Sequence, residues 1–441
     1  MALKSPDPLL TAAPWWRPHA GERLTIWGGR PLNGSYKVSG AKNAVLPMMV
    51  AGLLTPHLFT LRNVPASLDV AVLAALLRRL GCELHWSETG SGLMLTMCAD
   101  GVQPRQIDAE LVTRMRASIL LLGALLARCG EARLPLPGGD AIGLRGIDFH
   151  LAGLRAMGAD VEIADGMVKA SARRGLRGTD YVFPRVSVGA TENLLIAAAL
   201  AAGRTVLRNA AREPEIANLA DCLAAMGVLI AGAGSDTIVI EGGMPASGVV
   251  QRVMPDRIEI GTIACVAAMT DGEIVIRGAN RTLLGAAAPA LESAGVRLID
   301  REDSLIARRA PGGLVGIDVT TQPYPGFATD LQAPTMAMLT LAQGASRITE
   351  TIFDQRFRHV DELRRMGANI VVHGPTAVIR GVAKLGGAEV VGTDVRAAAA
   401  LLIAGLSAEG ETVLTGLDHL DRGYDAIVQK LTACGGRMVR S

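Results

Sequence analysis

The sequence lacks the residue clusters that mark metal centres and disulfide frameworks. Its 6 cysteines are scattered over 441 residues, with no C-x-x-C pair and no group of histidines beside them. Most lie in apolar periodic segments, where a free cysteine behaves as a small hydrophobic side chain. We therefore expect a reducing, cytoplasmic location, no structural metal and no cofactor.

Other absences narrow the class of protein further. Aromatic residues make up only 3% of the chain, so the core must be built from aliphatic side chains, which suits closely packed helices. The net charge of +2 gives no signature of nucleic-acid binding. The longest apolar stretches, residues 118–127 and 397–406, are about ten residues long, against the roughly 20 that cross a bilayer. They predict buried helices without membrane insertion. Residues 1–22 lack the apolar segment of a signal peptide, and we expect a disordered extension.

One sequence motif, Leu-x-x-(apolar)-Gly-x-x-(apolar), occurs six times along the chain. Successive copies lie about seventy residues apart, further than the roughly 20 to 50 residues of solenoid and propeller repeats. The pattern predicts the last turn of a helix, a glycine in the left-handed conformation, and then a strand. Six equal units of several elements each divide most simply into two domains of three. The six glycines are Gly81, Gly158, Gly227, Gly295, Gly367 and Gly435.

Three cations in the first half stand at expected helix starts or in loops. Lys42 begins a helix after a strand that breaks at Gly40, and free helix N–H groups there favour an anion. A solvated lysine is the plainer alternative. Arg116 opens the most apolar helix, where an arginine more often has an anionic partner. Residues 137–150 form a glycine-rich loop with Asp140 and Arg145, which either closes over a ligand or is a simple turn.

Polar pairs recur at like places in the second half, each just before or at an expected helix start. Each pair by itself is equally well explained as a helix N-cap with an exposed partner. Taken with Lys42, Arg116 and Arg145, the repeated cations predict a small, multiply anionic ligand bound by bidentate forks. The pairs are Asp256 with Arg257, Thr329 with Asp330, Arg356 with His359, Asp394 with Arg396, and Asp421 with Arg422.

Several ordered motifs, running from about Leu24 to the C-terminus, resemble the enolpyruvyl transferase family, in particular its sugar-nucleotide branch. The resemblance implies an α/β (α+β) protein: a two-domain inside-out barrel of six βαβαββ repeats, three per domain, with helices inside, sheets outside and the active site in a cleft between domains. One domain would be residues 23–41 with 255–441, and the other 42–254. The motifs occupy residues 39–44, 115–118, 136–139, 186–191, 211–216, 255–259 and 421–424.

The resemblance also implies a reaction between two small-molecule substrates. The enolpyruvyl group of phosphoenolpyruvate would pass to the 3-hydroxyl of UDP-N-acetylglucosamine with release of phosphate, the first committed step of peptidoglycan synthesis. The hydroxyl adds to C2 while C3 is protonated, and loss of phosphate leaves the enol ether. An uncharged alkene is a poor electrophile, so protonation and charge stabilisation must do most of the work. No oligomeric state is implied.

Roles follow for the residues that match the family's motifs. Asp140, Asp330, Lys42 and Arg422 would be catalytic, with Asp330 the base on the hydroxyl or, alternatively, only a helix cap. The phosphate would lie on Lys42, Arg145 and Arg422, the carboxylate on Arg356 and Arg396, and Asn43 beside them. The sugar nucleotide would contact Asn43, Arg116, Arg145, Gly146, Ile147, Asp148, Phe149, Arg185, Val186, Ser187, Val188, Asp330 and Ile352.

Two residues depart from the family's pattern. Asp140 stands where the family usually has cysteine, and Gly146 where it usually has proline. An aspartate can still deliver a proton if a neighbouring phosphate and partial desolvation keep it protonated, and it should make the protein insensitive to fosfomycin, which alkylates the cysteine. Two alternatives stay open: an enolpyruvyl transferase with another nucleotide or shikimate acceptor, and a catalytically silent paralogue that binds a UDP-sugar.

Overall fold

The computed structural model describes residues 13, 15–16, 21–90, 92–104 and 107–441. Their contacts divide the chain into two compact units. Of the described residues, unit 1 holds those before 17 and those within Gly40–Asp140 and Arg145–Met254, and unit 2 holds residues 21–39, Ala141–Leu144 and Pro255–Ser441. The domain boundaries expected from the sequence stay a prediction.

Most of the expected disordered extension, residues 1–22, lies outside the described residues. Within it, Ala13 and Trp16 are buried in the core of unit 1. The Trp15 ring meets the Trp86 ring edge to face, with 4.5 Å between the ring centroids. Such aromatic pairs stabilise beyond the area that they bury.

Unit 1 alternates helices with short strands. Its helices are α1 (Lys42–Ala51), η2 (Gly52–Leu54), α2 (Leu68–Arg79), α3 (Ala109–Arg114), η3 (Arg116–Ile119), α4 (Leu120–Cys129), α5 (Asp148–Ala156), α6 (Val188–Leu200) and α7 (Pro214–Ala225). Its strands are β3 (Phe59–Val64), β4 (Glu83–Thr89), β5 (Gly92–Cys98), β6 (Glu131–Pro135), β7 (Asp160–Ala164), β8 (Met167–Ser171), β9 (Asp180–Val182), β10 (Gly203–Arg208), β11 (Leu229–Ala231), β12 (Thr237–Gly242) and β13 (Val249–Arg252).

Unit 2 repeats this alternation. Its helices are α8 (Arg257–Met269), η4 (Arg281–Leu284), α9 (Ala287–Ser293), η5 (Thr329–Leu331), α10 (Gln332–Leu339), α11 (His359–Arg365), α12 (Val395–Ser407), α13 (Leu417–Gly423) and α14 (Ile427–Ala433). Its strands are β1 (Leu24–Trp27), β2 (Gly34–Lys37), β14 (Glu273–Arg277), β15 (Val296–Arg301), β16 (Ser304–Arg309), β17 (Asp318–Thr320), β18 (Ala345–Thr349), β19 (Asn369–His373), β20 (Thr376–Arg380), β21 (Glu389–Val391), β22 (Glu411–Thr415) and β23 (Arg437–Arg440).

The strands of the described residues form six sheets, three in each unit. Five sheets have four strands, and in each of these one edge strand runs parallel to its neighbour while the other pairings are antiparallel. The order β11-β12-β10-β9 recurs as β19-β20-β18-β17. The sixth sheet, β6-β8-β7, has three strands. This repetition confirms the fold class of six βαβαββ repeats.

The repeat glycines have the predicted conformation. All six have positive φ, from 90° at Gly295 to 102° at Gly227. Each follows the end of a helix and precedes a strand, as at Gly81 between α2 and β4. Residues other than glycine are sterically strained in this left-handed conformation, which explains why each repeat has a glycine at this position.

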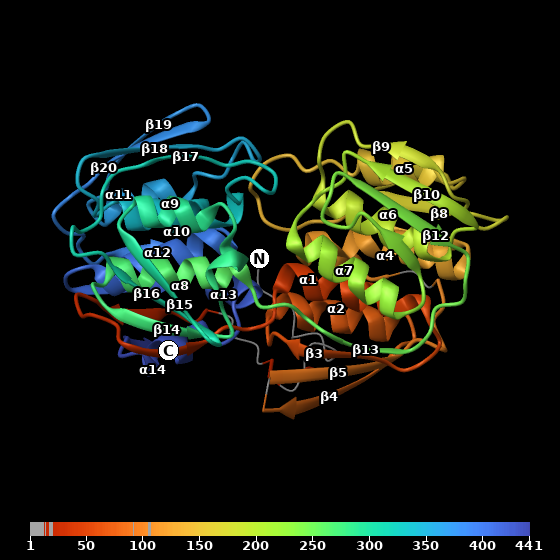
Figure 1. Cartoon of the computed structure of the whole chain (residues 1–441), viewed down its shortest axis with the longest axis horizontal. Coiled ribbons are helices and arrows are strands. Elements are labelled where there is room, and N and C mark those ends of the chain that lie inside the picture. Colours follow the sequence, from red (N-terminus) through yellow and green to blue (C-terminus); the bar gives the residue numbers. More distant parts are fainter. Residues whose placement is uncertain (1–12, 14, 17–20, 91, 105–106) are drawn as a thin grey trace. The chain divides into compact units, whose positions relative to one another are not determined.

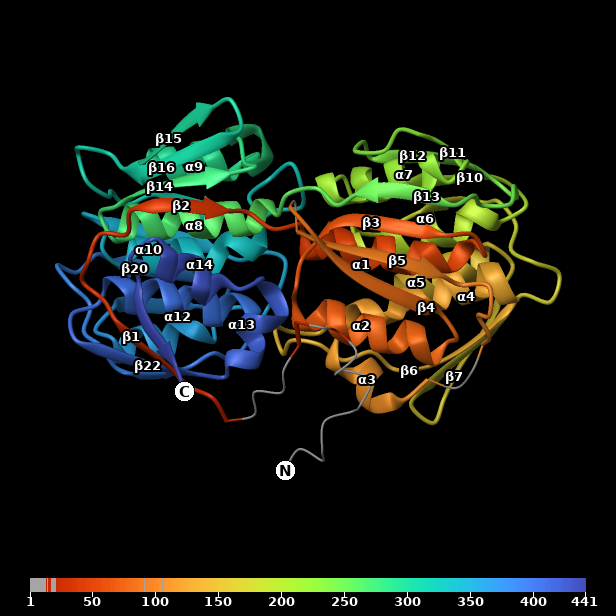
Figure 2. The ribbon, with the colours of Figure 1, turned by 90° about the horizontal axis from the view of Figure 1, so that it is seen from below.

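Apolar helices fill the interior of each unit. All thirteen residues of α8 are buried, and so are Ala190–Ala199 of α6. A helix that is apolar all round has no face to give to water, so it must lie inside its domain. Figures 1 and 2 show α8, α10 and α12 of unit 2 lying side by side, with strands of its sheets to the outside. The apolar runs at 118–127 and 397–406 lie in η3, α4 and α12, as buried helices.

Candidate active site

A carboxylate and two arginines meet in unit 2, and we call Asp330, Arg356 and Arg396 the carboxylate clamp. One Nη of Arg356 donates to Asp330 Oδ1 at 2.9 Å, and one Nη of Arg396 donates to Asp330 Oδ2 at 2.7 Å. The arginine side chains are 4% and 3% exposed, whereas Asp330 is 24% exposed. Each carboxylate oxygen therefore has its own guanidinium, and the carboxylate is the part of the clamp that solvent reaches.

Helix capping explains some of the predicted pairs but not Asp330. Asp394 caps α12 by accepting from the backbone N–H groups of Arg396 and Ala397, and Asp256 caps α8 in the same way. The two aspartates are therefore N-caps, but their partners Arg257 and Arg396 are buried rather than exposed, so that part of the alternative is wrong. Asp394 fixes the turn that carries Arg396. Asp330 lies inside η5, which has no side-chain cap. Its carboxylate bonds to the arginines instead.

Aromatic rings support both guanidiniums of the clamp. The guanidinium carbon of Arg356 lies 5.3 Å from the centroid of the Phe353 ring, and that of Arg396 lies 5.3 Å from the Tyr424 ring. Burial lowers the pKa of Arg396, but the nearby Asp330 carboxylate, together with Tyr424 and Asp256, outweighs burial and raises the pKa well above its usual value. Both arginines thus present a fixed planar fork, the geometry that binds a carboxylate.

Two further predicted residues of unit 2 lie elsewhere on its elements. Arg422 is half-buried in the last turn of α13, and Ile352 is half-buried in the loop after β18. The expectation that each polar pair stands at a helix start is wrong for Asp421 and Arg422. Asp421 accepts from both terminal nitrogens of Arg440, at 2.9 and 2.6 Å. That ion pair joins α13 to β23.

In unit 1, Lys42 is the first residue of α1, as the sequence predicts. Its Nζ lies 3.3 Å from Asp69 Oδ2, and the side chains of Lys42 and Asp69 are 12% and 6% exposed. Asn43 follows in the same turn and is half-buried. Asp69 was not predicted, because it stands in the first turn of α2 and its sequence context is that of a common helix-start aspartate.

The glycine-rich loop is held by two arginines, Arg116 and Arg145, which we call the loop arginines. One Nη of Arg116 donates to the carbonyl oxygens of Arg145 and Gly146, the latter at 2.7 Å. Arg145 in turn donates to the carbonyl of Asp140 at 3.0 Å. Burial and the charge of Arg145 lower the pKa of Arg116 to about 10, which Asp148 opposes. The structure thus links Arg116 to the backbone of Arg145 and Gly146, and Arg145 to the backbone of Asp140.

The remaining predicted residues of unit 1 lie at the starts of α5 and α6. Asp148 begins α5 directly after Ile147, and the guanidinium carbon of Arg185 lies 5.8 Å from the centroid of the Phe149 ring. Ser187 caps α6 through Ala190 N–H, with Val188 the first residue of that helix and Val186 just before it. A planar ring and a cation at two helix starts can bind a base and its phosphates.

A buried histidine behind this region was missed. His150 Nδ1 lies 3.0 Å from Asn193 Nδ2, so the amide donates and Nδ1 accepts. Burial and the charge of Arg116 lower the pKa of His150 to about 3. The position of His150 in the sequence does not distinguish it from a histidine on the exposed face of a helix.

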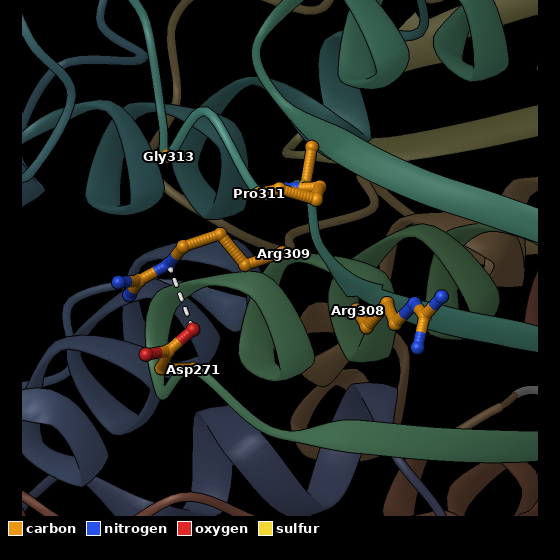
Figure 3. Close-up of a pocket in the computed structure, with 6 residues that line it drawn as sticks. Asp271, Arg308, Arg309, Pro311 and Gly313 are labelled. Atoms are coloured by element: carbon orange, nitrogen blue, oxygen red, sulfur yellow. Dashed lines mark ion pairs between the residues drawn. The ribbon is translucent and has the colours of Figure 1, made fainter.

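Figure 3 shows a pocket of unit 2 that holds none of the predicted residues. It is lined by Asp271, Arg308, Arg309, Ala310, Pro311 and Gly313. Arg309 donates to the carbonyls of Ala268 and Met269 at the end of α8, and Arg308 pairs with Glu273. These bonds explain the arginines as parts of the fold.

The described part of the chain contains neither a candidate membrane-spanning helix nor a cluster of potential metal ligands. None of its helices is both long and apolar enough to cross a membrane. Within the same residues, no group of three or more His, Cys, Asp or Glu side chains could hold a metal ion.

Residues 26–431 match the family described as EPSP synthase (3-phosphoshikimate 1-carboxyvinyltransferase). The chain is 51% identical over 420 residues to a UDP-N-acetylglucosamine 1-carboxyvinyltransferase of Gluconacetobacter diazotrophicus, covering 95% of this chain and 99% of that protein. A protein of the same name from Rhodospirillum centenum is 52% identical over 426 residues, with the same coverage.

Solved structures give a consistent result. The enolpyruvyl transferase NikO from Streptomyces tendae superposes with a TM-score of 0.86 at 26% identity, covering 95% of this chain and 99% of that one. EPSP synthase from Acinetobacter baumannii superposes with a TM-score of 0.72 at 19% identity, over 95% and 100% of the two chains, and so shares the fold.

Proposed function

Because the chain belongs to the enolpyruvyl transferase family, we propose that it transfers the enolpyruvyl group of phosphoenolpyruvate to the 3-hydroxyl of UDP-N-acetylglucosamine and releases phosphate. The observation that carries this proposal is the identity of about half of all positions to relatives of that one name, over 95% of the chain. An acceptor of another chemistry would require a different set of contacts in the site.

The carboxylate clamp supports a role for unit 2 in binding the carboxylate of phosphoenolpyruvate. Arg356 and Arg396 already hold a carboxylate, that of Asp330, with one guanidinium on each oxygen. The substrate's carboxylate has the same shape and charge. When it takes the two guanidiniums, Asp330 loses these two bonds and can turn to the 3-hydroxyl as the base that removes its proton.

Unit 1 would supply the phosphate and sugar-nucleotide contacts. Lys42 at the start of α1 and the loop arginines are cations held against protein groups, which suits the phosphate oxygens of either substrate. Arg422 would add a charge-assisted bond to the phosphate that leaves. Asp140 would donate the proton to C3 of phosphoenolpyruvate during the addition step, in place of the family's cysteine.

Two alternatives are distinguishable from this proposal. The glycine at 146, where the family usually has proline, favours to a lesser degree an enolpyruvyl transferase with another nucleotide acceptor. A silent paralogue would bind the sugar nucleotide without turnover. Because the chain holds six free cysteines among the described residues, we also propose that it works in the reducing cytoplasm.

Phosphate release from phosphoenolpyruvate, measured with a panel of acceptors, tests the proposal. We expect turnover with UDP-N-acetylglucosamine and none with UMP or shikimate 3-phosphate. Turnover with only UMP or only shikimate 3-phosphate would show that the acceptor is different, although the protein would still be an enolpyruvyl transferase. Binding of the sugar nucleotide without phosphate release from any acceptor would favour the silent paralogue.

A further inference from the structure

A buried carboxylate outside the predicted site joins two of its segments. Glu350 follows β18 directly and is 3% exposed. Its Oε2 accepts from the Thr329 hydroxyl at 2.9 Å. Its Oε1 accepts from the backbone N–H groups of Ile352 at 2.8 Å and Phe353 at 3.1 Å. Three donors thus satisfy a charge that would otherwise be costly to bury.

The sheet holds Glu350 in place. Its own N–H donates to the carbonyl of Pro375 at 2.8 Å, and the preceding Thr349 pairs with Thr376 of β20. A residue at the end of a hydrogen-bonded strand moves less than the loops around it. The carboxylate is therefore a fixed point to which the looser segments are attached.

Each of its two oxygens holds a segment that carries part of the clamp. The Thr329 hydroxyl on Oε2 precedes Asp330, the candidate base. The N–H of Phe353 on Oε1 fixes the residue whose ring lies 5.3 Å from the guanidinium carbon of Arg356. The N–H of Ile352 fixes a residue expected to contact the acceptor sugar.

We propose that Glu350 is a positioning residue for the transfer reaction, because it sets the distance between the segment of Asp330 and the segment of Arg356. The inference rests on the proposed function. Its Oε2 aligns the base and so acts on the chemical step, whereas its Oε1 seats Arg356 and so acts on phosphoenolpyruvate binding. A misplacement of about 1 Å is enough to cost a large factor in rate.

The two oxygens can be tested separately. Thr329→Val keeps the shape of the side chain and removes the donor to Oε2. We expect kcat to fall about tenfold, with the KM of both substrates within about twofold of the wild type. Thr329→Ser returns the hydroxyl and should recover most of the lost kcat.

Glu350→Ala removes both attachments. We expect a larger fall in kcat together with an approximately tenfold weaker affinity for phosphoenolpyruvate, measured by calorimetry. Glu350→Gln, whose amide oxygen can still accept from the two backbone N–H groups, should keep that affinity near the wild-type value. The control is Glu273→Ala, which removes an exposed glutamate paired with Arg308.

The outcomes separate the inference from the proposed function. Wild-type kcat and KM in Thr329→Val and Glu350→Ala, even with a lowered melting temperature, would show that Glu350 serves only the fold. If Glu350→Ala does not fold, the kcat values of Thr329→Val and Thr329→Ser decide whether the bond to Glu350 positions the segment of Asp330. If the wild type releases no phosphate, the proposed function fails, and phosphoenolpyruvate affinity in Glu350→Ala still tests the attachment of Arg356. A wild type that neither turns over nor binds phosphoenolpyruvate overturns both.

Discussion

The carboxylate clamp of unit 2 and the loop arginines of unit 1 are held by different means. In unit 2, Arg356 and Arg396 bond to a carboxylate, which neutralises one of their two charges. In unit 1, Arg116 and Arg145 bond to backbone carbonyls, which carry no net charge. A substrate carboxylate that takes the same two nitrogens would displace Asp330 in unit 2, whereas in unit 1 the bonds from the loop arginines go to uncharged groups. Under the proposed function, the first arrangement would couple substrate binding to the release of a base, and the second would keep a loop in shape.

The largest effect is expected for Asp330→Asn, which removes the carboxylate that distinguishes the clamp from the loop arginines. We expect kcat to fall about a thousandfold because the base is lost. The same change should tighten phosphoenolpyruvate binding, since an amide competes weakly for Arg356 and Arg396. Phosphate release measures the first effect and calorimetry the second.

The matched control is Asp361→Asn, which alters an exposed aspartate paired with Arg364 and should change neither quantity. Unchanged turnover in Asp330→Asn would remove Asp330 as the base. Weaker phosphoenolpyruvate binding would contradict the competition between the two carboxylates.

The next largest effect concerns Asp140 in the loop that Arg145 holds. Asp140→Ala should lose turnover by about a hundredfold or more, because no group remains to protonate C3. Asp140→Cys should keep turnover and become sensitive to fosfomycin, because a thiolate attacks an epoxide far faster than a carboxylate does. The wild type should stay active with fosfomycin present.

Mass spectrometry of the treated proteins provides the check, with an adduct expected on residue 140 of Asp140→Cys alone. Time-dependent inactivation of the wild type, or full activity of Asp140→Ala, would count against this assignment.

The sequence predicted those parts of the molecule that depend on local physics. The apolar runs became the buried α4 and α12, and the repeat glycines took positive φ. Lys42 stands at a helix start, and Asp394 is a cap. Each of these depends on residues within a turn or two, where periodicity and capping preferences act.

What the sequence did not reveal are pairings between distant segments. Strand β13 completes the sheet of β3 by a parallel pairing that joins Val249 to Phe59. The partners of Asp330 lie 26 and 66 positions away, and Glu350 reaches back to Thr329. Spacing reveals that a unit is repeated, but it does not say which loops of the folded units converge.

A smaller effect on substrate binding is expected from a change in the loop arginines of unit 1. Arg116→Lys replaces a planar fork by a single ammonium that cannot hold the Arg145 and Gly146 carbonyls in the same geometry. We expect the KM of UDP-N-acetylglucosamine to rise about tenfold, while phosphoenolpyruvate affinity stays near the wild-type value, because the carboxylate clamp is untouched.

Arg114→Lys is the control for that change. Arg114 lies two residues earlier and pairs with the exposed Glu110 at 2.6 Å, so its replacement should leave both constants unchanged. Equal weakening of both substrates in Arg116→Lys would mean that the loop arginines and the carboxylate clamp do not serve separate ligands.

The smallest expected effect is on the stability of unit 1 toward acid. Burial lowers the pKa of His150 from 6.5 to about 3, so the folded state keeps the ring neutral where the unfolded state takes up a proton. The stabilisation is full above pH 6.5 and is lost as the pH falls toward 3. Between pH 7 and pH 5 the loss of this stabilisation should lower the free energy of unfolding by about 1–2 kcal/mol.

His150→Gln, although less stable at neutral pH, should therefore show a flatter dependence of the free energy of unfolding on pH. Removal of the exposed His373 by the same substitution is the control, and denaturant unfolding at several pH values is the measurement. An equal slope in His150→Gln and the wild type would mean that His150 is protonated in the folded protein, with Asn193 no longer its donor.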